Sequence, residues 1–313
     1  MNSYFSQEFL NTSANAISSE ISKNSFFSKK SILKNEIIDK IMLETELFDL
    51  KFNSLDISSV HDHDGYYMSN GLAKSKTLFN LLTSNEITNI SKEYLGKKYR
   101  LKCHRVYSVS SGAKNPWHTD DKKYGTKNEN IKGLVFIIYL NDVFDGEFQA
   151  VRGSHLYSRE FKYPNFDTHT MEKYSRDIES FKMPKGSIVI FDNKTIHRAK
   201  PYTNFFWRRK SLFFQIDNEI EDGEKIIVKT EFINNLSENQ SMLLGMGQPS
   251  EMPHEPSRTG ITTMNFKTIL NLQLQILKAI KSRLIHNLKL LLNDKTKRFI
   301  QKFYKKNIKV NTE

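Results

Sequence analysis

The sequence predicts an α+β fold with a mainly β core, and two observations carry this prediction. Between residues 99 and 217 the chain holds short segments rich in Val, Ile, Phe and Tyr, separated by Gly, Asn, Asp or Pro. Short strands with irregular connections are typical of an all-β sandwich or jelly roll. On either side of this region, apolar residues recur at helical intervals, which predicts flanking helices. The expected strands are 99–109, 133–140, 146–151, 186–192 and 207–216.

Residues 1–98 are expected to form a helical support region. The apolar residues between Ser31 and Leu50 recur every three or four positions, and a second stretch with this spacing runs from Lys76 to Tyr94. This spacing is typical of helices that pack one face against a core. The polar, glycine-bearing segment between them, 61–71, is expected to be a loop.

Two irregular segments accompany the core, which we place at 99–217. Residues 154–183 form a long polar stretch between two expected strands, and loops of this length often shape a binding pocket. Residues 218–263 lose periodicity and hold three of the seven prolines. We expect this second segment to wrap back on the body or to link it to the C-terminal region.

The positive charge is concentrated at the C-terminal end. The net charge is +12, and residues 264–313 contribute twelve Lys and Arg against only Asp294 and Glu313, so the rest is nearly neutral. Leucines and isoleucines at helical spacing predict a basic amphipathic helix here. It could pack on the body, pair with a second copy in a dimer, or contact an anionic membrane surface. A nucleic-acid partner is disfavoured, since the near-neutral body shows no aromatic platform or reading motif.

The composition also limits where in the cell the protein is expected. Cys103 is the single cysteine, which excludes a disulfide scaffold and a zinc site made of thiolates alone. No segment approaches the roughly 18 consecutive apolar residues that a membrane span needs. The first ten residues show no basic segment followed by an apolar run, so no signal peptide is predicted. We expect a cytoplasmic protein, with peripheral membrane contact as one role of the tail.

Three polar side chains at strand ends form the candidate site. His118 and Asp120 are two residues apart on an extended segment, so their side chains project from one face. His197 follows the buried strand expected at 186–192, and it could add a second imidazole from a neighbouring strand. Two histidines and one carboxylate on one octahedral face are typical of non-haem Fe(II) oxygenases. We therefore predict that His118, Asp120 and His197 are metal ligands.

A basic anchor follows these three residues. Arg208 and Arg209 open the strand expected at 207–216, and a guanidinium there could bind a carboxylate through two hydrogen bonds. Because side chains alternate along a strand, Arg209 and Ser211 share one face, and Arg208 faces the other way. We favour Arg209 with Ser211 and keep Arg208 second. Tyr107, on the strand that leads toward His118, is a further candidate for the same carboxylate.

The order of these motifs resembles the Fe(II)- and 2-oxoglutarate-dependent dioxygenases. The resemblance covers about residues 99–217 and extends to both the phytanoyl-CoA dioxygenase-like and prolyl-hydroxylase-like branches. It rests on His118-Thr119-Asp120, on Gly146 to His155, on Pro184-Lys185-Gly186-Ser187 with Phe191-Asp192 and His197-Arg198, and on Arg209-Lys210-Ser211. It implies a double-stranded β-helix, with iron on His118, Asp120 and His197. A basic residue at 208–209 would bind the distal carboxylate of 2-oxoglutarate.

The resemblance also implies an activity. Such an enzyme would use Fe(II), 2-oxoglutarate and O₂, would release succinate and CO₂, and would most simply hydroxylate a small-molecule, lipid or glycan substrate. Desaturation and ring formation use the same iron site and stay open. The alternative from another class is a non-catalytic jelly-roll binding or scaffold protein with a membrane- or partner-binding tail. A cupin-type metal protein is a third alternative, although cupins usually rely on three histidines.

Overall fold

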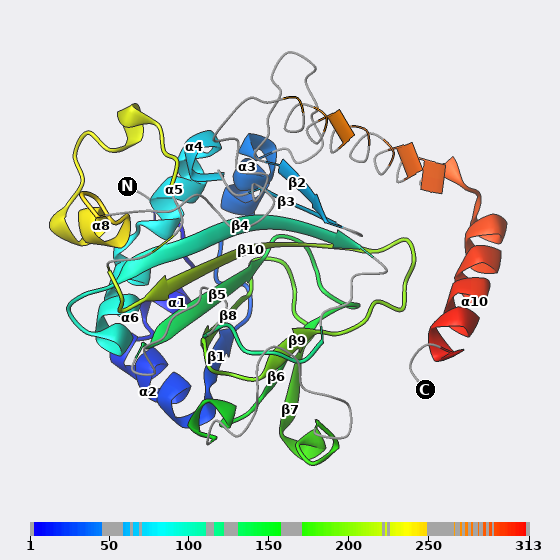
Figure 1. Ribbon diagram of the computed structural model, residues 1–313, viewed down its shortest axis with the longest axis horizontal. Coiled ribbons are helices and arrows are strands. Elements are labelled where there is room, and N and C mark those ends of the chain that lie inside the picture. Colours follow the sequence, from blue (N-terminus) through cyan, green and yellow to red (C-terminus); the bar gives the residue numbers. More distant parts are fainter. Residues whose placement is uncertain are drawn as a thin grey trace.

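The computed structural model describes most of the chain. The described residues are 3–45, 59–62, 65–68, 71–110, 116–121, 131–157, 171–220, 223, 226–248, 291–310 and scattered positions between 266 and 289. Within them the protein combines helices with two antiparallel sheets, which confirms the predicted α+β class (Figure 1). No described helix is both long and apolar enough to cross a bilayer.

The larger sheet has seven strands and forms the frame of the molecule. Every neighbouring pair in it runs antiparallel. The longest contact joins β10 to β4, with one register irregularity next to Gln215. Across the sheet the order is β1 (Phe26–Lys29), β8 (Ile188–Asp192), β5 (Gly133–Tyr139), β10 (Arg208–Asp217), β4 (Arg100–Ser110), β3 (Gly65–Met68) and β2 (Ser59–Asp62).

The smaller sheet has three strands and packs on one face of the larger one. Its order is β7 (Ile178–Phe181), β6 (Phe148–Val151) and β9 (His197–Ala199). Phe148 and Phe181 from this sheet share a buried cluster with Val135, Val189 and Phe191 from the larger sheet. The space between the two sheets is therefore a packed apolar interior, and β9 brings His197 to its edge.

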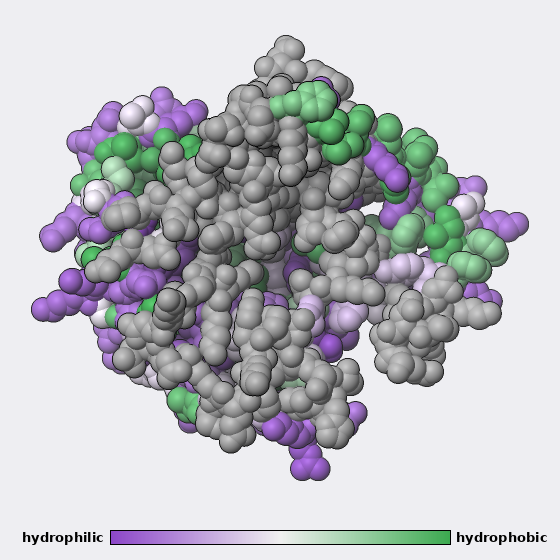
Figure 2. Space-filling model, in the orientation of Figure 1, coloured by the Kyte–Doolittle hydropathy of each residue, from purple (hydrophilic) through white to green (hydrophobic). Residues whose placement is uncertain are grey.

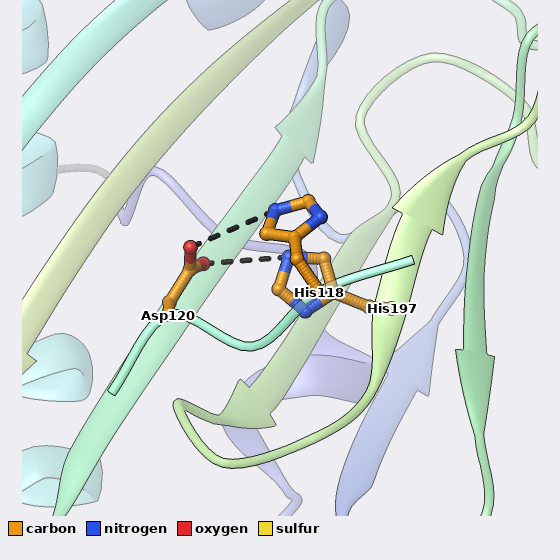
Figure 3. Close-up of side chains that lie close together, drawn as sticks. All are labelled: His118, Asp120 and His197. Atoms are coloured by element: carbon orange, nitrogen blue, oxygen red, sulfur yellow. Dashed lines mark ion pairs between the residues drawn. The ribbon is translucent and has the colours of Figure 1, made fainter. Parts of the chain in front are cut away.

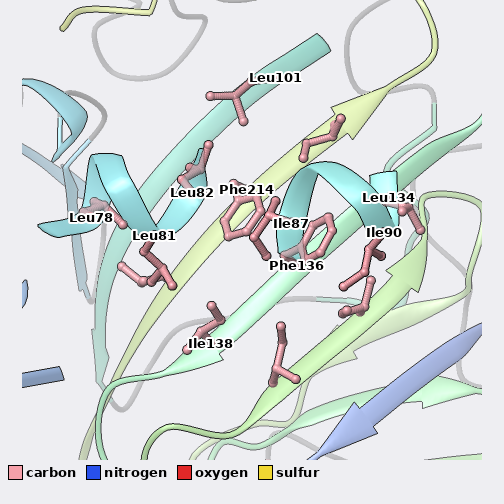
Figure 4. Close-up of a cluster of buried hydrophobic side chains, with 14 of the residues drawn as sticks. Leu78, Leu81, Leu82, Ile87, Ile90, Leu101, Leu134, Phe136, Ile138 and Phe214 are labelled. Atoms are coloured by element: carbon pink, nitrogen blue, oxygen red, sulfur yellow. The ribbon is translucent and has the colours of Figure 1, made fainter. Parts of the chain in front are cut away.

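Helices cover the opposite face of the larger sheet. Figure 4 shows Leu78, Leu81 and Ile87 packed over Phe136 and Phe214 of the sheet. Helices α5 and α6 begin at Ser75 and Ser84, whose hydroxyls accept hydrogen bonds from backbone N–H groups in the first turn. The helices on or near this layer are α1 (Gln7–Leu10), α2 (Ala14–Asn24), α3 (Asn35–Glu44), α4 (Gly71–Lys74), α5 (Lys76–Leu82), α6 (Asn85–Leu95) and α8 (Glu238–Leu243).

The N-terminal region is not wholly helical, which corrects the expectation for residues 1–98. Phe26–Lys29 forms β1 at the edge of the larger sheet beside β8. Phe26 is buried in the cluster between the sheets and Phe27 in the cluster under the helices. A strand with both faces buried shows no alternation of polar and apolar residues, so its pattern does not reveal it. Residues 59–68, placed partly in a loop, supply β2 and β3.

The remaining differences concern short strands and helix breaks. The five expected strands are present, but β7 lies inside the segment expected as a polar insertion, and β9 has only three residues. The expected helix at 76–94 is divided between α5 and α6. The expected C-terminal helix is interrupted at residues 292–293, after which α10 (Asp294–Val310) begins. Such short elements leave no periodicity for a sequence pattern to detect.

The buried carboxyl of Asp217, at the end of β10, makes folding stability depend on pH. Burial raises the pKa of this carboxyl from its ordinary value of 3.8 to about 7. The folded state then holds the proton more tightly than the unfolded state, so stability decreases as pH rises from about 4 to about 7. Between pH 5 and 8 we expect the wild-type protein to lose about 2 kcal/mol more of its unfolding free energy than Asp217→Asn. Urea denaturation at both pH values measures this, and parallel losses in both proteins would refute it.

Candidate active site

A pair of backbone hydrogen bonds joins the two predicted histidine ligands. His118 N donates to the His197 carbonyl and His197 N donates to the His118 carbonyl, each at 2.9 Å. This antiparallel bridge extends the smaller sheet beyond β9. Residues directly opposite in such a bridge place their side chains on the same face. The two imidazole rings accordingly lie with their centroids 4.3 Å apart.

Asp120 completes the group. Its backbone N–H donates to the Asn193 carbonyl at 2.8 Å, which ties this residue to the end of β8. Its carboxylate oxygens lie 3.8 Å from His118 Nε2 and 3.4 Å from His197 Nε2 (Figure 3). One ligand atom from each of the three residues falls within 4.8 Å of the others. The structure therefore brings together the three residues that the sequence predicts as ligands.

The second nitrogen of each imidazole fixes which atom is presented to this group. His118 Nδ1 lies 2.7 Å from the Pro116 carbonyl, and His197 Nδ1 lies 2.9 Å from the Thr195 carbonyl. A carbonyl only accepts hydrogen bonds, so the proton of a neutral imidazole resides on Nδ1 and Nε2 keeps its lone pair. Metal-binding histidines are typically oriented in this way by a carbonyl partner. The donor set thus fits a divalent metal ion.

Burial supports the same conclusion. The side chains of Asp120 and His197 are 1% and 6% exposed, whereas that of His118 is 21% exposed. The rings of Phe148 and Phe191 lie 5.3 and 4.8 Å from the ring of His197. A cation held between the three residues would place positive charge beside a deeply buried carboxylate, whose burial is otherwise costly. Of the three side chains, that of His118 is the most exposed.

The larger sheet settles which face each candidate anchor residue occupies. Ser211 pairs with both Tyr107 and Tyr139, so these three side chains lie on one face of the sheet. Arg209 lies two residues before Ser211 and points to the same face, where its guanidinium donates to the Gly146 carbonyl. Tyr139 belongs to the cluster between the sheets, which contains the phenylalanines that contact His197. Arg208 lies on the opposite face.

A further candidate, Tyr202, lies near Arg209 and is not among the residues predicted from the sequence. It is 2% exposed. Burial raises its pKa, and the nearby Arg209 guanidinium opposes this shift. Among the described residues, neither the Tyr202 hydroxyl nor Arg209 Nε has a hydrogen-bond partner. Two buried donors without acceptors at one place suit an anionic ligand group.

A tight turn holds Tyr202 in place. Gly146 has a φ of +62°, and a Cβ there would lie 2.3 Å from the Tyr202 ring. The neighbouring Asp145 carboxylate accepts hydrogen bonds from Thr203 and Asn204. The turn before β6 therefore supports the loop between β9 and β10. No periodic pattern in the sequence marks Tyr202 as a site residue. Its place follows from the contact between the Gly146 turn and this loop, which lie far apart in the sequence.

Comparison with known proteins agrees with this geometry. The model of the phytanoyl-CoA dioxygenase (PhyH) family matches residues 57–210, about half of the chain. Among solved structures, the chain is similar to SnoK, a non-haem alpha-ketoglutarate-dependent carbocyclase from nogalamycin biosynthesis. The two share 16% sequence identity with a TM-score of 0.52, over 67% of this chain and 85% of SnoK. No curated protein sequence matches.

The chain belongs to the Fe(II)- and 2-oxoglutarate-dependent dioxygenase superfamily. Its cofactor set is accordingly Fe(II), 2-oxoglutarate and O₂, and the described cluster of His118, Asp120 and His197 is suited to iron. The enzyme is an oxygenase of this type acting on a small molecule. His155, which ends the motif Gly146 to His155, lies outside this cluster, and its Nε2 is 3.1 Å from the Ser22 carbonyl.

Loss of one ligand should weaken Fe(II) binding strongly. We expect His197→Ala and Asp120→Asn each to reduce Fe(II) affinity by more than roughly 100-fold, because each removes a donor from a three-residue set. The matched control is His155→Ala, which removes an imidazole outside the cluster and should bind as wild type. Anaerobic competition with a chromogenic chelator measures the affinities. Equal affinities in His197→Ala and His155→Ala would refute the assignment.

Proposed function

We propose that this protein is an Fe(II)- and 2-oxoglutarate-dependent hydroxylase in which His118, Asp120 and His197 hold the iron. The observation that carries the proposal is the hydrogen-bonded pair of histidines with Asp120 beside them, both Nε2 atoms turned to its carboxylate. Three protein ligands leave the remaining coordination positions for 2-oxoglutarate and O₂. The two facing sheets support a double-stranded β-helix as the core fold.

The proposed reaction replaces a C–H bond of the substrate with C–OH. Bound Fe(II) supplies the redox chemistry through which 2-oxoglutarate and O₂ give succinate and CO₂, with one oxygen atom entering succinate and the other the product. The residues of this chain orient the ligands and limit the access of water. The rings of Phe148 and Phe191 pack against His197 and place apolar surface beside this ligand, which limits the approach of water from their side.

Arg209 and Tyr202 are proposed to bind the distal carboxylate of 2-oxoglutarate. Arg209 Nε and the Tyr202 hydroxyl are two buried donors that find no acceptor among the described residues, and Ser211 and Tyr107 lie on the same face of the sheet as Arg209. A guanidinium and a hydroxyl that converge on one carboxylate give charge-assisted hydrogen bonds and a fixed orientation. The substrate belongs to the small-molecule, lipid or glycan classes, and the segment 171–183, which includes β7 of the smaller sheet, is proposed to help shape its pocket.

Anaerobic titration with Fe(II) and 2-oxoglutarate tests the cofactor pair. The chelate should give a weak visible charge-transfer band in the wild-type protein. Arg209→Gln should need roughly 10- to 100-fold more 2-oxoglutarate, which corresponds to the loss of about 1.5–3 kcal/mol of hydrogen bonds to a charged group. Tyr202→Phe should have a smaller effect in the same direction.

The matched control is Arg208→Gln, which removes the same charge from the opposite face of β10. This variant should need a 2-oxoglutarate concentration within about threefold of that for wild type, because the distal carboxylate is bound by a positioned guanidinium and not by net charge alone. A larger effect in Arg208→Gln than in Arg209→Gln would transfer the anchor role to Arg208. Absence of the charge-transfer band in folded wild-type protein would refute the proposed enzymatic function and favour a non-catalytic binding protein. Once a substrate is found, incorporation of a single ¹⁸O atom from ¹⁸O₂ distinguishes hydroxylation from desaturation or ring formation.

A further inference from the structure

An apolar stripe runs along the surface of the segment between Phe266 and Leu291. Every described residue in this segment has helical backbone. At 100° per residue, the large apolar residues that the structure describes in this segment fall within an arc of roughly 120°. Each is between 41% and 82% exposed, and Figure 2 shows them as a green band at the upper right. The stripe consists of Phe266, Leu270, Leu274, Leu277, Leu284, Ile285, Leu288 and Leu291.

Such a stripe is unusual on the surface of a soluble domain. Single exposed leucines are ordinary on a soluble domain. Eight large exposed apolar side chains along one side of a segment instead mark a contact with another molecule or with a membrane. The described body shows nothing comparable: its exposed large apolar residues, such as Leu43, Leu156 and Ile227, lie in separate elements.

The stripe continues onto α10 together with basic residues. Phe299 and Phe303 are 72% and 63% exposed on α10. Lys295, Arg298 and Lys302 are exposed and lie beside them on the helical wheel. Lys281 interrupts the stripe, and a lysine there can extend its ammonium group toward the polar boundary of a bilayer.

Charge decides between the possible occupants of this surface. Residues 264–313 carry twelve basic and two acidic residues, whereas the rest of the chain is nearly neutral. A second copy would place the same excess of positive charge against itself, so the tails would repel. An anionic lipid surface instead accepts the apolar stripe among its acyl chains and pairs its headgroups with the lysines and arginines.

Helix α10 and Lys289 contact the body of the protein. Gln301 accepts a hydrogen bond from Phe205 N and donates to the Thr203 carbonyl. The ring of Tyr304 lies 5.2 Å from the ring of Phe205, and Lys289 Nζ lies 3.3 Å from the centroid of the same ring. These contacts join α10 and Lys289 to the loop between β9 and β10, and Gln301 lies on the side of α10 opposite Phe299 and Phe303.

We infer that the stripe, together with Phe299 and Phe303 and the basic residues beside them on α10, forms a peripheral membrane-docking surface for anionic lipid bilayers. The apolar stripe enters the interfacial region, and the basic residues bind lipid headgroups. This inference does not depend on catalysis, because the surface is separate from the three metal-ligand candidates. Through Gln301 and Phe205, docking also places the loop that carries Tyr202 next to the membrane-bound tail.

Flotation of the full-length protein with vesicles tests the inference. Wild-type protein should float with phosphatidylcholine vesicles containing about 30% phosphatidylserine and much less with phosphatidylcholine alone. The triple variant Leu277→Glu/Leu284→Glu/Leu288→Glu should partition at least about tenfold less. The matched control is Leu43→Glu/Leu156→Glu/Ile227→Glu, which adds the same charge at exposed body positions and should partition within about twofold of wild type.

Salt and self-association complete the test. Raising the salt from about 0.1 M to about 1 M should reduce flotation of the wild-type protein, since it shortens the Debye length from about 10 Å to about 3 Å. Equal flotation of the stripe and control variants would overturn the inference, as would equal binding to neutral and anionic vesicles. A wild-type protein that does not float, but forms a dimer by light scattering that the stripe variant loses, would also overturn it and assign the surface to a second copy.

Discussion

The backbone bridge between His118 and His197 is the constraint on which the candidate site depends. Its two hydrogen bonds fix the separation of the two chain segments, and the alternation of an extended chain then turns both imidazoles to one side. Asp120 reaches the same point because its own N–H is tied to Asn193, at the end of a strand in the other sheet. The site therefore sits where the two sheets meet, and the three ligand atoms are positioned by backbone pairing rather than by flexible side chains.

The apolar interior between the sheets connects this site to the proposed anchor of the co-substrate. The ring of Phe148 lies against His197, while its backbone N–H donates to the Tyr139 hydroxyl at 3.4 Å. Tyr139 in turn lies near Arg209, whose guanidinium opposes the rise in the Tyr139 pKa that burial causes. A single packed interior thus carries the metal-ligand candidates at one place and, at another, the half-buried Arg209, whose Nε has no acceptor among the described residues. A bound dicarboxylate needs two such places, because one end binds at the metal and the distal carboxylate needs a cation and hydrogen-bond donors.

Much of this arrangement follows from local sequence patterns. Five strands are short segments rich in Val, Ile, Phe and Tyr and bounded by turn residues, and the two-residue spacing of His118 and Asp120 places both on one face. The alternation on β10 separates Arg209 from Arg208 before any contact is known. Other features depend on tertiary pairing. Phe26–Lys29 becomes a strand only because the edge of β8 is available, β9 is too short for a pattern, and Tyr202 is placed by a turn at Gly146 distant in sequence. The C-terminal region shows its amphipathic pattern plainly, but the break at residues 292–293 follows no periodic signal.

Anomalous diffraction at the iron edge, from crystals grown anaerobically with Fe(II) and 2-oxoglutarate, tests the central claim most directly. We predict one strong peak within bonding distance, about 2.0–2.2 Å, of His118 Nε2, His197 Nε2 and an Asp120 carboxylate oxygen. Density for 2-oxoglutarate should extend from this peak, with its distal carboxylate at Arg209 and Tyr202. An iron peak on other residues, or a folded crystal with 2-oxoglutarate and no iron between the bridged histidines, would contradict the assignment of this site.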